Sequence, residues 1–207
     1  LIFFLFMVTA ALAHEVPCKD ESRFDERLAA AELQIEKVAE LKEKKDSSWK
    51  KELEQVYLEL RRLSYEKQSS PELYFLFAKS YQHNDSIGKA IKMTEKALFF
   101  KPDFIEALIL MGDLHTEEIK KNYYDETGDV ESFFHSKRKK AVESYEAALK
   151  ITDIDNSVVS IIYLKLGDLN YIFPLSKKSA KEFWKKASEI APDSSSAKTA
   201  LERLQKN

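Results

Sequence analysis

The chain has 207 residues, of which 33% are charged, and its net charge at pH 7 is only −2. This near-neutral balance excludes the strongly basic surface that proteins use to bind the phosphate backbone of nucleic acids. The single cysteine excludes an internal disulfide, and no set of cysteines and histidines has the spacing of a metal site. With only four glycines and five prolines, the composition is typical of a helical, solvated protein.

The chain opens on an apolar run. Residues 1–8 read LIFFLFMV and are followed by TAALA. The run is shorter than the roughly 20 residues that a helix needs to cross a bilayer, and Ala11-Leu12-Ala13 has the pattern of a signal-peptide cleavage site. We therefore predict a signal peptide over residues 1–13, a flexible mature N-terminus over residues 14–21, and an exported protein that is periplasmic or secreted. The alternative is a buried, hydrophobic N-terminal helix.

Cys18 raises a second possibility, because exported lipoproteins carry a lipid on a cysteine just after the apolar run. The residues before it, Glu15-Val16-Pro17, match the usual leucine–small–small pattern poorly. A free thiol in the mature N-terminus is therefore the favoured interpretation. Attachment to the membrane through a lipid on Cys18 is the alternative.

Residues 22–67 are predicted to form an N-terminal helical hairpin. Apolar residues recur at steps of three and four from Phe24 to Leu41 and again from Trp49 to Leu63. The pair lacks the small-residue positions found further along the chain, so it is a degenerate repeat or a capping hairpin. The alternative is an extended coiled coil that joins two copies of the chain into a homo-oligomer.

Three similar units follow between residues 71 and 192. In each unit, a first predicted helix carries large and small residues, and a second predicted helix carries small residues. In the second and third units, the second helix also carries an aromatic residue. The residues that carry the pattern are Tyr74, Phe77, Ala78, Tyr81, Ala90, Ala97 and Pro102; then Leu108, Met111, Gly112, Ala141, Tyr145 and Ala148; then Tyr163, Leu166, Gly167, Ala180, Trp184, Ala187 and Pro192. This pattern resembles the tetratricopeptide repeat family. Small residues let two helices approach closely, and large residues fill the gaps beside them.

The resemblance implies an all-α fold, a right-handed superhelix of helical hairpins with a C-terminal capping helix over residues 193–207. The sequence departs from the family pattern in four places. Thr94 stands where the family has an aromatic residue, and His115 and Asn170 stand where it has tyrosine. Asp153 replaces the closing proline of the second unit.

The second unit carries an insertion over residues 117–137. Its flanks have a helical composition on either side of one clear turn, so we expect both helices of this unit to be extended by about two turns and to project as an arm. The aromatic residues near its tip are candidate partner contacts: Tyr123, Tyr124, Phe133 and Phe134. The alternative is that these side chains pack on one another and hold the arm together.

The family resemblance also implies that the first helices line a concave groove. The candidate groove residues are Phe75, Lys79, Ile109, Asp113, Leu164, Asp168 and Tyr171. A subgroup of the family grips peptide carboxylates with lysine, arginine and asparagine here, so the two aspartates and the apolar row argue against such a clamp. An apolar row should not face water without a use. Either a partner segment lies in the groove, or the chain fills it with its own N-terminal or C-terminal helix.

No catalytic motif, phosphate-binding loop or dinucleotide fingerprint occurs, so we predict no enzyme, no cofactor and no metal site. The expected function is that of an exported protein-interaction module or scaffold that binds a peptide or a partner protein and no nucleic acid. Two alternatives stay open: an accessory protein that binds an apolar, lipid-like ligand, and a structural subunit of an envelope complex or homo-oligomer. Membrane attachment is expected only through a lipid on Cys18.

Overall fold

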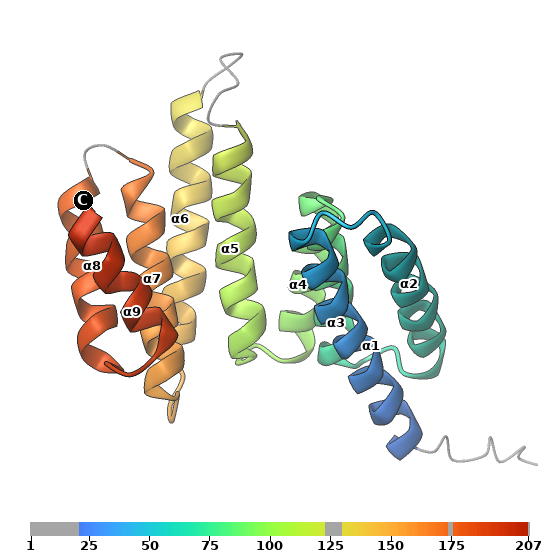
Figure 1. Ribbon diagram of the computed structural model, residues 1–207. Helices are drawn as coiled ribbons and strands as arrows, with labels where there is room; N and C mark the ends of the chain where they lie inside the picture. The colour runs from blue at the N-terminus through green and yellow to red at the C-terminus, as the bar shows by residue number, and fades with distance from the viewer. Residues whose placement is uncertain (1–20, 123–129, 174–175, 207) are drawn as a thin grey trace, which may run out of the picture.

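The computed structural model describes residues 21–122, 130–173 and 176–206, and this part of the chain is all-α, as predicted (Figure 1). None of its helices combines the length and the apolar character needed to span a bilayer. The predicted signal peptide, Cys18, Tyr123 and Tyr124 lie outside the described residues. The helices are α1 Glu21–Glu43, α2 Trp49–Glu66, α3 Pro71–His83, α4 Ile87–Phe100, α5 Ile105–Asn122, α6 Val130–Leu149, α7 Asn156–Tyr171, α8 Lys177–Ile190 and α9 Ser195–Lys206.

The helices form hairpins that lie side by side along the molecule (Figure 1). Within the hairpins, α1 packs against α2, α3 against α4, α5 against α6 and α7 against α8. Between them, α3 contacts both α1 and α2, α5 contacts α4, and α7 contacts both α5 and α6. In the second, third and fourth hairpins, the first helix therefore packs on the preceding hairpin. The last hairpin is covered by α9, which contacts both α7 and α8.

The N-terminal hairpin shares its core with α3. Phe24 and Ile35 of α1, Leu60 of α2 and Leu73 of α3 are buried in one apolar cluster. Burial of such side chains is the main source of stability at this contact. The apolar stripe that a coiled coil between two chains would need is thus buried within this chain.

Glycine makes room for a buried aromatic ring in two of the hairpins. A Cβ atom on Gly112 of α5 would overlap the ring of Tyr145 in α6, and a Cβ atom on Gly167 of α7 would overlap the indole of Trp184 in α8. Both rings are almost completely buried. The close approach of each helix pair therefore depends on the missing side chain.

The α3–α4 hairpin has a different combination of residues at the same register positions. Ala78 of α3 stands at the glycine position, Thr94 of α4 stands at the ring position, and both are completely buried. The hydroxyl of Thr94 donates to the carbonyl of Ala90 at 2.9 Å. By analogy with Gly112, where an added Cβ atom would overlap the Tyr145 ring, we infer that the Cβ atom of Ala78 leaves too little room for a ring at position 94.

The α5–α6 pair is longer than its neighbours. These helices have 18 and 20 residues, against 13 in α3 and 14 in α4, and Figure 1 shows the pair extending beyond the adjacent hairpins. Glu118 joins the two helices, with Lys137 Nζ at 2.7 Å and His115 Nδ1 at 2.9 Å from its carboxylate. The rings of Phe133 and Phe134 meet edge to face with centroids 5.6 Å apart. These two adjacent rings contact each other, and Phe134 also packs against the core shared by α5, α6 and α7.

Candidate functional site

Three helices, α1, α3 and α5, run in the same direction and form one face of the molecule. Near the middle of α1, the carboxylate of Glu32 lies 3.7 Å from Lys79 Nζ of α3. Near the end of α1, Lys42 Nζ donates to the carbonyl of His83 at 2.5 Å, where α3 also ends. Two pockets open on this face, one at each end of the three helices, and α5 contributes to both.

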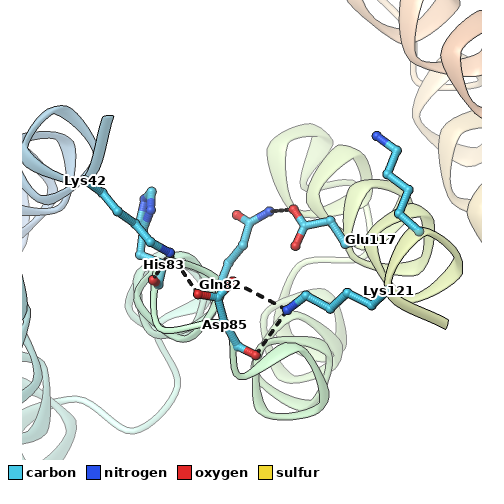
Figure 2. A pocket seen from close by; sticks show the side chains of 7 residues that line it. Lys42, Gln82, His83, Asp85, Glu117 and Lys121 are labelled. Atoms are coloured by element: carbon cyan, nitrogen blue, oxygen red, sulfur yellow. Dashed lines mark hydrogen bonds and ion pairs between the residues drawn. The ribbon is translucent and has the colours of Figure 1, made fainter. Parts of the chain in front are cut away.

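The pocket at the C-terminal ends of these helices, here called the lysine pocket, has a volume of about 470 Å³ (Figure 2). It is lined by Lys42, Gln82, His83, Asp85, Glu117, Lys120 and Lys121. Burial is the main cause that lowers the pKa of His83, and the charges of Lys42 and Lys79 lower it further. With a neutral histidine, three lysines and two carboxylates leave the pocket with a net positive charge that suits an anion.

Asp85 lies at the centre of the lysine pocket. Figure 2 shows Lys42 and Lys121 approaching it from opposite sides, with Lys42 Nζ 3.1 Å from Oδ2 and Lys121 Nζ 3.4 Å from Oδ1. The hydrogen bond from Lys42 is the main cause that lowers the pKa of Asp85. Its backbone is left-handed, with a φ of 57°, a conformation that aspartate tolerates better than most residues. The α3–α4 turn thus presents one carboxylate to two lysines.

The ion pairs of Asp85 can be exchanged for others. Its side chain is 65% exposed, and ion pairs this close to water contribute little free energy. Lys120 has no ion pair with any described residue. Loss of the Asp85 ion pairs would therefore break no strong internal contact.

The pocket at the N-terminal ends, here called the carboxylate pocket, has a volume of about 320 Å³. It is lined by Asp25, Leu28, Ala29, Glu32, Glu72, Phe75, Leu76, Phe104 and Glu106. Phe75 and Phe104 form an aromatic wall, with ring centroids 5.1 Å apart. The pocket therefore combines an apolar wall with an acidic rim.

No lysine or arginine lines the carboxylate pocket itself. Two lysines lie beside its aromatic wall, with Lys79 Nζ 5.6 Å from the centre of the Phe75 ring and Lys101 Nζ 4.8 Å from the centre of the Phe104 ring. Glu32 pairs with Lys79 at the edge of the pocket. Among the described residues, no ion pair reaches Asp25, Glu72 or Glu106. A cationic side chain with an apolar stem, such as that of lysine or arginine, matches both the wall and the rim.

The two pockets lie at opposite ends of the same helices. With a helical rise of about 1.5 Å per residue, their separation is roughly 12 Å along α3 and roughly 20 Å along α5. The carboxylates gather where the helices begin and the lysines gather where they end. This is the arrangement that helix dipoles favour, so the charges that shape the pockets also suit the helices that carry them.

The groove residues predicted from the sequence are distributed over several cores. Phe75 lines the carboxylate pocket and Lys79 lies at its edge. Ile109 packs on the core shared by α5, α6 and α7, whereas Leu164 and Tyr171 pack around the buried tryptophan of α8. The three members of the predicted apolar row thus pack into different clusters.

The two predicted groove aspartates have partners inside the protein. Asp113 accepts a hydrogen bond from the Tyr145 hydroxyl at 2.7 Å and pairs with Lys165 of α7 at 2.7 Å. Asp168 accepts a hydrogen bond from Nε1 of Trp184 at 3.0 Å. Each aspartate directly follows the glycine that admits the ring. The glycine gives the ring its space, and the aspartate binds its polar edge.

Helix α9 packs on α7, the helix that carries the predicted groove residues of the last repeat. Leu204 of α9 packs with Leu164 and Tyr171 of α7, and Arg203 Nε lies 3.4 Å from the carboxylate of Asp168. At this end of the stack, the predicted groove residues Leu164, Asp168 and Tyr171 pack or pair with the C-terminal part of the chain itself. At the other end, α1 lies beside α3 and leaves the carboxylate pocket open.

Sequence patterns do not reveal the lysine pocket, because its charges resemble ordinary helix ends and its aspartate resembles a helix cap. One signal could have indicated it. Lys42 lies in the last turn of α1, and Lys120 and Lys121 lie in the last turn of α5. First helices that stack in the same direction bring their last turns together.

Comparison with models of protein families finds no family that matches the chain, and no curated protein matches its sequence. In the described part of the chain, no group of three or more histidine, cysteine, aspartate or glutamate residues is placed to hold a metal ion. The tetratricopeptide resemblance therefore rests on the motif residues themselves.

Proposed function

We propose that the protein is an exported helical-repeat module of the tetratricopeptide type that binds a peptide segment of a partner protein across the face of α1, α3 and α5. One observation carries the proposal: two pockets of opposite charge lie at opposite ends of the same three helices. A right-handed superhelix, as the resemblance implies, would make this face concave. The predicted signal peptide over residues 1–13 would account for export.

The two pockets define the chemistry of the bound segment. A lysine or arginine would lay its stem along the apolar wall, beside the Lys79 and Lys101 side chains that already lie over Phe75 and Phe104, and place its charge on the acidic rim. A carboxylate, from a side chain or a chain terminus, would take the place of Asp85 between Lys42 and Lys121. An extended chain rises about 3.3 Å per residue. About four to six residues therefore separate the two charges of the segment, given a separation of roughly 12–20 Å.

The charged linings favour this function over the apolar-ligand alternative. An apolar, lipid-like molecule in the carboxylate pocket would remove water from its four carboxylates and offer them no partner. Uncompensated removal of a charge from water is unfavourable. A peptide with a cationic side chain supplies that partner.

Selection of random peptides displayed on phage tests the proposal. We expect the enriched peptides to carry a lysine or arginine beside an apolar residue, and an acidic residue or free C-terminus about four to six residues away. A synthetic peptide of that sequence should then bind the protein when its fluorescence anisotropy is measured. Enrichment without this pattern of charges would contradict the proposal.

Charge reversals locate the binding site of the selected peptide. Glu106→Lys in the carboxylate pocket and Lys121→Glu in the lysine pocket should each weaken binding by about tenfold or more at low salt. Glu182→Lys and Lys181→Glu make the same charge changes at exposed positions of α8 and should leave binding unchanged. The proposal fails if the α8 variants weaken binding as much as the pocket variants.

A further inference from the structure

Helix α4 has an outer face that is both basic and aromatic. Its inner face, with Ala90, Thr94 and Ala97, is buried. Its outer face ends in Phe99, which is 80% exposed, and Phe100, which is 41% exposed. The other residues of the outer face are Gly88, Lys89, Lys92, Glu95 and Lys96, followed by Lys101 just after the helix, and all of them are exposed. Adjacent exposed aromatic side chains at one end of a helix mark an interaction site.

The aromatic part of this face is continuous from α4 to α3. The rings of Phe99 and Phe100 meet edge to face with centroids 5.3 Å apart. Phe100 stacks on Tyr74 of α3 at 5.7 Å, and Lys96 Nζ lies 5.1 Å from the Tyr74 ring. The exposed rings therefore form one patch that borders directly on the lysines.

The lysines of this face are not neutralised by the protein. Within the described residues, no ion pair reaches Lys89, Lys92, Lys96 or Lys101, and Glu95 is the one acidic residue among them. The contacts that these lysines do make are with rings, such as that of Lys101 Nζ at 4.8 Å from the centre of the Phe104 ring. Their charge is available to an anionic partner.

We propose that the outer face of α4 docks on an anionic lipid surface. The lysines would face the lipid phosphates, while Phe99 and Phe100 enter the boundary between headgroups and acyl chains. The face is the outside of a helix and not a groove, so a yielding, extended surface fits it better than a peptide segment does. This contact needs no lipid on Cys18, and it does not depend on the peptide-binding face, to which α4 does not contribute.

A tryptophan at position 99 tests the contact directly. Phe99→Trp should shift its emission to the blue and be quenched by brominated acyl chains when vesicles of phosphatidylglycerol and phosphatidylcholine are added. Leu33→Trp is the matched control, because Leu33 is an apolar residue of α1 that is 67% exposed, and it should show neither change. Absence of quenching in Phe99→Trp, or equal quenching in both variants, would overturn the proposal.

The charge dependence is tested in the same Phe99→Trp protein. Lys92→Gln with Lys96→Gln should weaken vesicle binding about tenfold or more, because each lysine near an anionic surface contributes appreciably to attraction. Lys50→Gln with Lys51→Gln removes the same charge from exposed positions of α2 and should have little effect. Equal losses in both pairs would overturn the proposal. Binding of polyglutamate without any response to vesicles would also overturn it and would assign the face to an acidic protein.

Discussion

Gly112 allows a direct test of how the hairpins are held together. Alanine at this position adds a Cβ atom that would lie 2.6 Å from Cζ and 2.7 Å from Cδ1 of Tyr145, far closer than carbon atoms approach without bonding. The ring cannot move freely, because it is 1% exposed and its hydroxyl donates to Asp113 at 2.7 Å. Gly112→Ala must therefore displace the ring, α6, or both.

Two opposing effects determine how much Gly112→Ala changes the free energy of unfolding. Alanine favours a helix over glycine by about 1 kcal/mol, whereas overpacking a core costs about 1–3 kcal/mol, and a strained hydrogen bond to a carboxylate adds to that cost. We expect the overlap to prevail and Gly112→Ala to lose about 1–3 kcal/mol of unfolding free energy. Gly88 of α4 is the matched control, because no atom lies within 4 Å of its added Cβ. Gly88→Ala should gain up to about 1 kcal/mol.

Urea unfolding followed by far-UV circular dichroism measures both changes. Tyr145→Thr installs the residue that the α3–α4 hairpin has at this position, Thr94, and removes the ring. In that background, Gly112→Ala should no longer destabilise the protein, which corresponds to a coupling of about 1 kcal/mol or more. An equal loss in both backgrounds would refute the reasoning, as would a gain in Gly112→Ala similar to that in Gly88→Ala.

Three further predictions concern stability. Thr94→Tyr should lower the melting temperature because Ala78 occupies the space for the ring, and adding Ala78→Gly should restore most of the loss in a calorimetric scan. Burial lowers the pKa of His115 below its usual 6.5, so the unfolded chain binds a proton that the folded protein does not. Stability should therefore fall as the pH drops below about 6.5, and urea unfolding at pH 7 and pH 5 should show a smaller fall in His115→Gln; an unchanged fall would contradict this. Lys165→Met removes the ion pair with the partly exposed Asp113 and should cost about 0.5–1 kcal/mol in 0.05 M salt, with a clearly smaller loss in 1 M salt.

Much of the fold could be predicted from the positions at which helices touch. Where two helices approach closely, only a few residue types fit between them. Gly112 and Gly167 therefore indicate the first helices of their hairpins, and Tyr145 and Trp184 indicate the second. Thr94 could not be explained from its own position. We attribute it to Ala78 of the facing helix, which stands where α5 and α7 have glycine, a pairing that becomes visible only when both helices are in place.

The candidate site could be predicted much less well. The register of the family resemblance predicts that Asp113 lies in the groove. Its observed partners, Tyr145 and Lys165, stand 32 and 52 residues further along the chain. The lysine pocket has the same difficulty, because Lys42 and Lys121 meet only where two first helices end beside the turn that holds Asp85. Local periodicity shows which side of a helix is apolar. It does not show which charges from different helices share a pocket.

The order of contacts between helices has a mechanical consequence. In the described part of the chain, the extensive helix contacts join only neighbouring hairpins and the covering helix α9. The molecule is therefore a row of units and not a closed globule. The stability of each junction depends only on the contacts between the two hairpins that meet there. A force applied to the two ends should detach hairpins one after another, beginning with the weakest junction, so that extension proceeds in steps and not in a single rupture.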